Sequence, residues 1–136
     1  MQKYIEEFKT NSENITIADW KKYDVQGLLK ESALLITDLS SIFMDFGYMR
    51  KPMIYYQFDM EKFRKGQYQQ GYFEYKRDGF GPVCETLEEL ENALEKLAKR
   101  NLQIEETYLE REKEFFPLWD IENCKRNYEA IKSLEK

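Results

Sequence analysis

The chain has 136 residues, the size of one ordinary domain that can bury a core without disulfides or metal ions. Its 21 lysines and arginines against 26 aspartates and glutamates give a net charge of −5, the wrong sign for a surface that binds nucleic acid through its phosphates. The sequence contains no histidine, so it supplies neither a histidine acid–base catalyst nor a histidine zinc ligand.

Two cysteines, Cys84 and Cys124, lack the spacing of a zinc site, and we expect them to be reduced thiols of a cytosolic protein. No stretch approaches the roughly 18 apolar residues of a membrane-spanning helix, and no apolar leader opens the chain. We therefore expect a cytoplasmic protein that carries no membrane or secretion signal of its own.

The first half of the chain alternates between two patterns. Short apolar runs at residues 15–18, 34–37 and 52–56 predict buried strands, and apolar residues at helical spacing predict helices over 25–32 and 40–49. Strands that are apolar on both faces and alternate with helices favour parallel pairing. The sequence thus predicts part of a doubly wound α/β sheet.

Residues 58–80 are charged and rich in tyrosine, without a clean period, and predict a long excursion with a helical turn near 60–65. The chain then returns to an extended form at residues 81–84.

The last third of the chain is helical in pattern. Thr86 and Glu89 form a capping box ahead of a predicted helix over residues 87–100. Two further helices are predicted around residues 104–114 and 121–134.

The segment with the clearest chemistry follows the predicted strand at residues 34–37. Ser40 and Ser41 are small hydroxyl residues at the carboxyl end of a parallel strand, where ligands of such sheets bind beside the start of the next helix. Their O–H groups can donate to phosphate oxygens, and Asp45, one turn later, can accept from sugar or polyol hydroxyls. The alternative is that Asp38 or Ser40 is an ordinary helix cap and Asp45 an ordinary exposed residue.

Three other groups of residues have both a functional and a structural interpretation. The tyrosines of residues 68–75 could stack on a sugar or nucleoside ring or anchor the loop, and we favour anchoring. The aromatic residues of 115–119 could form a partner-binding patch or belong to the core, and we favour the core. Four cations could attract a polyphosphate but are usually just solvated: Arg50, Lys51, Arg64 and Lys65.

Three segments in this order resemble a known family: residues 35–45 (LITDLSSIFMD), 51–56 (KPMIYY) and 79–83 (GFGPV). They resemble the CDP-glycerol glycerophosphotransferase family of teichoic acid synthesis. That family shows a Thr-Asp-Tyr-Ser-Ser stretch with a following Asp, then a Lys-Pro strand, a tyrosine-rich loop and a Gly-Pro strand. The ordered set is more specific than any one of its parts, and the likeness covers residues 14–100.

The resemblance implies a GT-B architecture of two Rossmann-like halves. This chain, residues 1–136, would be one domain, the C-terminal portion of the donor-binding half: a three-layer parallel sheet with a helical tail over 101–136. Such enzymes transfer glycerol phosphate from CDP-glycerol to a teichoic acid primer or polymer and release CMP.

The resemblance also assigns roles to residues of this chain. In the family the Ser-Ser pair and the following Asp contact the donor, which implies that Ser40, Ser41 and Asp45 bind CDP-glycerol, with Thr37 and Asp38 in support. No catalytic residue is assigned to this chain, because the family's catalytic histidines lie in segments outside this sequence. No cofactor or metal ligand is assigned either. The implied partners are CDP-glycerol and a lipid-linked acceptor, at the cytoplasmic face of the membrane.

Two other classes of function remain open on the residues alone. A flavodoxin-like or receiver-like module also places acidic residues at the ends of parallel strands, but it requires five strands. An interaction domain would use the helical tail from residue 103 onward to dock on another protein.

Overall fold

In the computed structural model, residues 12–19, 21–66 and 71–134 are described. The chain divides into two compact units, Met1–Ala33 and Leu34–Lys136. The first unit contains helix α2 (Val25–Glu31), in the range predicted. Its N-cap is Asp24, whose Oδ2 accepts a hydrogen bond from the Gly27 N–H at 2.9 Å.

The strand predicted at residues 15–18 is wrong. Residues 15–19 take no regular structure, and Ile15 is 58% exposed. A run of β-branched residues forms a strand only when its backbone finds a partner strand. No strand of the described chain pairs with this run.

The second unit is built on a small parallel sheet. Its strands are β1 (Leu35–Thr37), β2 (Met53–Tyr56) and β3 (Val83–Cys84), in the order β1-β2-β3. Both pairings are parallel, with Thr37 opposite Tyr55 and Tyr55 opposite Val83. The parallel α/β arrangement predicted from the alternating pattern is confirmed.

The described residues of the second unit also form six helices: α3 (Ile42–Tyr48), α4 (Met60–Gly66), α5 (Tyr75–Asp78), α6 (Leu87–Lys99), α7 (Glu106–Phe115) and α8 (Asn123–Ser133). The capping box of α6 is confirmed, since Thr86 Oγ1 accepts from the Glu89 N–H and Glu89 Oε2 accepts from the Thr86 N–H. The short helix α5 is not predicted by the sequence pattern.

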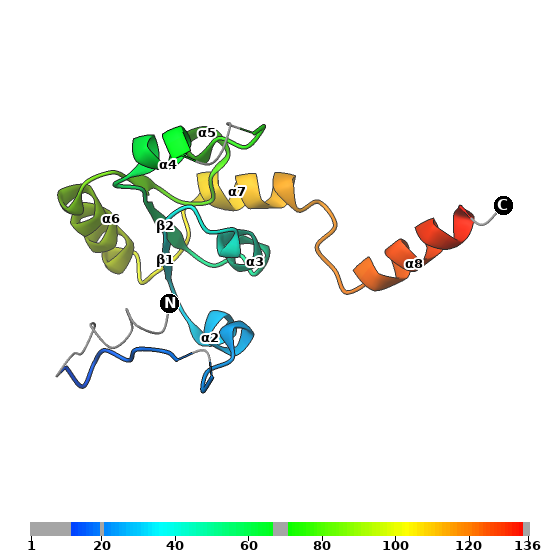
Figure 1. Ribbon diagram of the computed structural model, residues 1–136, viewed down its shortest axis with the longest axis horizontal. Coiled ribbons are helices and arrows are strands. Elements are labelled where there is room, and N and C mark those ends of the chain that lie inside the picture. The colour runs from blue at the N-terminus through cyan, green and yellow to red at the C-terminus, as the bar shows by residue number, and fades with distance from the viewer. Residues whose placement is uncertain (1–11, 20, 67–70, 135–136) are drawn as a thin grey trace. The chain divides into compact units, whose positions relative to one another are not determined.

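The sheet lies between two helical layers. On β2, Ile54 and Tyr56 face α6, where Ile54 joins a buried cluster with Leu90 and Leu97. Tyr55 points to the opposite face and packs edge-on against Phe43 of α3, with ring centroids 5.4 Å apart. Because α6 and α3 cover opposite faces, the second unit has three layers (Figure 1).

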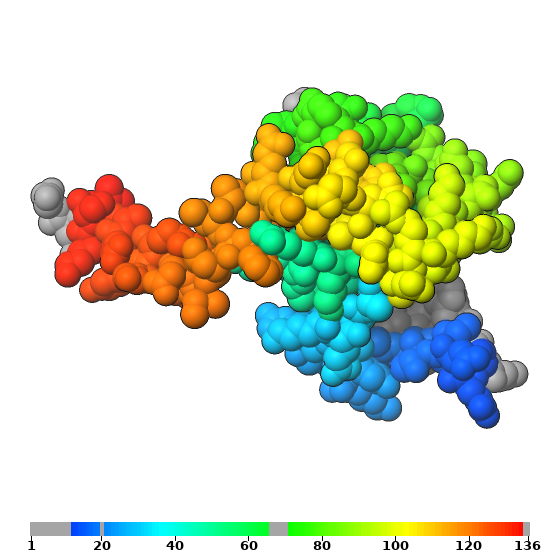
Figure 2. All heavy atoms as spheres, turned by 180° about the vertical axis from the view of Figure 1, so that it is seen from behind, coloured from blue at the N-terminus to red at the C-terminus, as the bar shows by residue number. Residues whose placement is uncertain are grey.

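A second core consists of aromatic rings from α3, from β2, from the segment around α5 (residues 72–80) and from the end of α7. Neighbouring ring centroids lie 4.9 to 5.9 Å apart. This aromatic cluster comprises Phe43, Tyr55, Phe73, Tyr75, Phe80, Phe115 and Phe116. Figure 2 shows α7 (yellow to orange) lying against α3 (teal).

The aromatic cluster shows where the rings of the two ambiguous segments pack. Phe73 and Tyr75 are anchors of the long excursion, as the structural interpretation predicts, whereas Tyr72 is exposed and Tyr68 lies outside the described residues. Phe115 and Phe116 pack in the core, while Trp119 is half exposed.

Candidate functional site

The predicted site residues lie together where β1 ends and α3 begins. Four of their side chains are exposed, those of Asp38, Ser40, Ser41 and Asp45, and Thr37 is half-buried. They occupy the carboxyl edge of the parallel sheet, as predicted from the sequence. The β1–α3 junction, residues 37–45, therefore presents these four polar side chains to solvent, whereas Phe43 within it is buried.

Neither serine hydroxyl at the junction caps the helix. Asp38 Oδ1 accepts a hydrogen bond from the Ser40 N–H at 3.0 Å and shapes the turn. The residue at the N-cap of α3 is Ser41, in a helical conformation and without a side-chain cap bond. Within the described chain, the hydroxyls of Ser40 and Ser41 have no hydrogen-bond partner and are available to a ligand. The structure does not show the capping roles of the alternative interpretation.

A buried amide holds the junction in place from β2. Gln57 follows β2 directly and is only 3% exposed. Its Nε2 donates to the Asp38 carbonyl at 3.3 Å, and its backbone N–H donates to the Cys84 carbonyl at 2.8 Å. Gln57 therefore joins the carboxyl ends of all three strands. Gln57 is not among the residues predicted from the sequence, although a polar side chain directly after a buried strand is a usable signal.

Replacing Gln57 with leucine is expected to lower the free energy of unfolding by about 1 to 2 kcal/mol, because the Asp38 carbonyl loses its side-chain donor. The amide signal of Ser40 should also shift, since its turn is no longer fixed. Urea unfolding and an amide spectrum measure both effects. Gln103→Leu, at an exposed position, is the control and should change neither. Equal behaviour of the two variants would show that Gln57 does not hold the junction.

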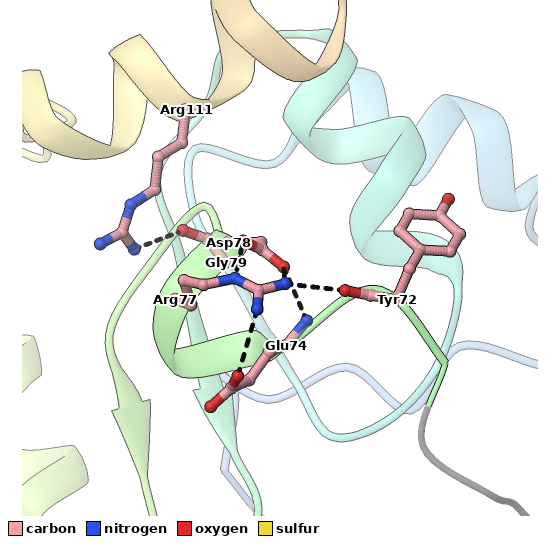
Figure 3. A network of polar contacts seen from close by, with 6 residues as sticks. All are labelled: Tyr72, Glu74, Arg77, Asp78, Gly79 and Arg111. Carbon is pink, nitrogen blue, oxygen red and sulfur yellow. Dashed lines mark hydrogen bonds and ion pairs between the residues drawn. The ribbon is translucent and has the colours of Figure 1, made fainter.

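The segment around α5 is held against α7 by a polar network (Figure 3). Arg77 donates to both Asp78 carboxylate oxygens, at 2.6 and 2.7 Å, and to the Tyr72 carbonyl at 2.8 Å. From α7, Arg111 donates to the Gly79 carbonyl at 3.0 Å. The hydrogen bond from Arg77, followed by one from the Glu74 backbone N–H, lowers the pKa of Asp78 to about 2. The network thus links Tyr72 to α5 and, through Arg111, joins this segment to α7.

The four cations considered above do not gather at the junction. Arg50 stacks over the Trp119 ring, with its guanidinium carbon 3.8 Å from the ring centroid. Lys51 lies over the Phe46 ring, and Arg64 and Lys65 are exposed in the last turn of α4. No polyphosphate site built from these four cations is observed.

Two cavities lie away from the junction. One, of about 580 Å³, is a groove between α6 and α7 whose floor includes Met53 of β2 and Val83 of β3. The other, of about 630 Å³, is lined by side chains of the polar network and by Phe115. Neither is lined by Ser40, Ser41 or Asp45. The exposed serines, rather than a closed pocket, define the candidate site.

The part of the chain that the structure describes has neither a metal-binding cluster nor a membrane-spanning helix. Residues 12–19, 21–66 and 71–134 contain no cluster of three or more acidic or thiol side chains suited to a metal ion. Among these residues, no helix has the length and apolar character needed to cross a membrane. Both cysteines are free thiols, with Cys84 buried and Cys124 exposed.

Comparison with curated proteins gives relatives in teichoic acid synthesis. The minor teichoic acid biosynthesis protein GgaB of Bacillus subtilis is 34% identical over 129 residues, which are 88% of this chain and 14% of that protein. A teichoic acid poly(glycerol phosphate) polymerase of Bacillus subtilis is 32% identical over 63% of this chain and 12% of its own length. A teichoic acid glycerol-phosphate transferase of Staphylococcus aureus is 36% identical over 54% of this chain and 19% of its own length.

The chain therefore spans less than a fifth of each of these relatives. No solved structure matches it significantly. The family model described as CDP-Glycerol:Poly(glycerophosphate) glycerophosphotransferase matches residues 2–133, nearly the whole chain. With this match and the identity to GgaB, the chain belongs to the CDP-glycerol:poly(glycerophosphate) glycerophosphotransferase family.

Proposed function

We propose that this chain is the donor-binding part of a glycerophosphotransferase that uses CDP-glycerol to extend a teichoic acid primer or polymer. The observation that carries the proposal is the state of Ser40 and Ser41. Both are exposed at the carboxyl edge of a parallel sheet, and no described residue bonds to their hydroxyls. The family membership and the names of the relatives supply the substrate class.

The residue types at the junction fit a nucleotide diphosphate carrying a polyol. Ser40 and Ser41 can donate O–H bonds to diphosphate oxygens, and their small size lets those oxygens approach the backbone. Asp45 lies one helical turn after Ser41, so the two project from the same side of α3. Its carboxylate accepts hydrogen bonds from a hydroxyl of the glycerol.

The proposed reaction is an in-line transfer at phosphorus. An acceptor hydroxyl attacks the phosphorus that carries glycerol, the new P–O bond forms, and the bond to the CMP oxygen breaks. The hydroxyls and amides of the junction stabilise the charge on the departing CMP. The acceptor's proton goes to a base outside this chain, which contains no histidine. The junction therefore binds and orients the donor.

The rest of the enzyme is also part of the proposal. A GT-B architecture with a second Rossmann-like half would complete the cleft, and a lipid-linked acceptor would approach at the cytoplasmic face of the membrane. The isolated chain is then expected to show no turnover and to bind CDP-glycerol only in the millimolar range, because contacts from the other half are absent.

The experiment is a titration of the isotopically labelled 136-residue chain with CDP-glycerol, followed by amide chemical shifts. We expect shifts concentrated at residues 37–45 and a dissociation constant raised at least about tenfold in the double variant Ser40→Ala/Ser41→Ala. Ser133→Ala removes an exposed hydroxyl on α8 and is the matched control.

The proposal fails if the labelled chain at millimolar CDP-glycerol shows shifts elsewhere or none at residues 37–45. It also fails if the double alanine variant binds as the wild type does. A Ser133→Ala variant that weakens binding as much as the double variant would mean that loss of any hydroxyl, rather than the junction, explains the effect.

A protein-interaction function is the second candidate, and α8 favours it. Its apolar side chains Tyr128, Ile131 and Leu134 are exposed, and Ile121 just before it is 95% exposed. Removal of residues 122–136 would abolish such an interaction and leave the CDP-glycerol shifts at the junction unchanged. The flavodoxin-like alternative requires five strands, whereas the described sheet has three.

A further inference from the structure

The side chain of Tyr75, the first residue of α5, is fixed beside the β1–α3 junction. Its ring centroid lies 5.0 Å from Tyr55, 5.5 Å from Phe73 and 5.6 Å from Phe43. Tyr55 is paired in register with Thr37 at the end of β1, and Phe43 belongs to the first turn of α3. The ring thus packs on Phe43, which lies within the junction, and on Tyr55, the register partner of Thr37. Tyr75 itself is 30 or more positions from every residue of the junction.

The Tyr75 hydroxyl is a proton donor without a protein acceptor in the described chain. Tyr75 is half-buried, and no described residue bonds to its oxygen. Asp38 directly follows Thr37, the register partner of Tyr55, on which the Tyr75 ring packs. Burial, followed by the Asp38 carboxylate, raises the pKa of Tyr75 above its ordinary value, at which a phenol is already protonated at neutral pH. The Tyr75 oxygen is not among the fully buried, unpartnered polar atoms of the described residues, so the hydroxyl is accessible to solvent and to a ligand.

We propose that Tyr75 and Asp38 together bind one hydroxyl group of the donor. The ligand hydroxyl accepts a hydrogen bond from the Tyr75 O–H and donates its own proton to the Asp38 carboxylate. A hydroxyl group can do both, whereas a phosphate oxygen only accepts and is repelled by Asp38. This inference rests on the proposed function and adds to it a residue that selects for a polyol or sugar hydroxyl.

The hydroxyl can come from the glycerol or from the ribose of CDP-glycerol. Three probes separate the two sources: CDP-glycerol, CMP and glycerol 3-phosphate. Ring signals of Tyr75 in a ¹³C-tyrosine-labelled chain should move with CDP-glycerol in either case. If the bound hydroxyl belongs to the ribose, CMP moves the Tyr75 signal as well. If it belongs to the glycerol, glycerol 3-phosphate moves that signal.

The matched variants are Tyr75→Phe and Tyr108→Phe. Tyr108 is also half-buried, and burial, followed by the neighbouring Glu105, raises its pKa, but it lines the groove between α6 and α7. We expect Tyr75→Phe to raise the dissociation constant of CDP-glycerol about five- to tenfold while the shifts at Ser40 and Ser41 persist. Tyr108→Phe should bind as the wild type does.

The outcomes separate this inference from the proposed function. If the wild-type chain shows no shifts at Ser40 and Ser41, the proposed function fails and the inference fails with it. If those shifts occur but Tyr75→Phe binds within twofold of the wild type, or the Tyr75 ring signals stay still in the wild-type chain, only the inference fails. The ring signals need no variant, so a poorly folded Tyr75→Phe protein would not leave the question open.

Discussion

Replacing Glu112 with glutamine is expected to raise the free energy of unfolding by about 4 kcal/mol near pH 7.5 and to change it little near pH 4. Glu112 lies on α7, is only 1% exposed, and neither carboxyl oxygen has a hydrogen-bond partner in the described residues. Burial raises the pKa of Glu112 to about 8, and the nearby Arg50 opposes that effect only in part. The buried carboxyl therefore favours its neutral form.

The direction of the pH dependence follows from the raised pKa of Glu112. The folded state binds the proton more tightly than the unfolded state, whose glutamate pKa is near 4.5. The stabilising contribution is complete below about pH 4.5. It is lost by up to about 1.4 kcal/mol per pH unit as the pH rises toward 8. Glutamine has the same shape and cannot ionise, so Glu112→Gln should remove this pH dependence.

Urea unfolding of the wild type and of Glu112→Gln at several pH values between 4 and 8.5 measures the difference. Glu114→Gln is the control, because Glu114 is exposed on the same helix. Its stability curve should run parallel to that of the wild type. If Glu112→Gln also stays parallel to the wild type at all pH values, Glu112 is not a buried neutral acid.

Ending the chain after residue 102 is expected to unfold the second unit, whereas ending it after Ile121 should cost less than about 1 kcal/mol. The shorter chain loses α7 and with it Phe115 and Phe116, which pack against Phe80 at centroid distances of 5.4 and 5.6 Å. Loss of two such rings costs more than about 5 kcal/mol, comparable to the whole stability of a small domain. The longer chain loses only α8, which has no buried residue.

Circular dichroism and the dispersion of amide signals measure the outcome for both truncated chains. A folded protein ending at residue 102 would contradict the assignment of α7 to the core. The result also decides how an interaction role of the tail is tested. Only the deletion of residues 122–136 leaves a folded protein in which α8 alone is missing.

Local patterns in the sequence predicted much of the architecture. The apolar runs gave β1 and β2, and the pair Thr86 and Glu89 gave the start of α6, because each signal lies within a few neighbouring residues. The run at residues 15–18 has the same composition as a strand but no partner, and the sequence does not show which runs will pair. The helix α5 is four residues long, too short to establish a period.

The position of the candidate site could also be predicted, because its residues form a local pattern. Residues 37–45 are contiguous, so their place after a strand could be inferred from the order of elements. The contacts of Gln57 and Tyr75 with the junction bridge 19 or more positions and depend on the folded sheet and the aromatic cluster. The burial of Glu112 is likewise a tertiary effect, since its helix carries charged residues on both sides of it.

A crystal structure of the chain soaked in millimolar CDP-glycerol would show whether the β1–α3 junction binds the donor. We expect diphosphate oxygens within about 3 Å of the hydroxyl oxygens of Ser40 and Ser41, at the carboxyl edge of the sheet. A diphosphate bound instead in the groove between α6 and α7, with both serines still facing solvent, would contradict this expectation.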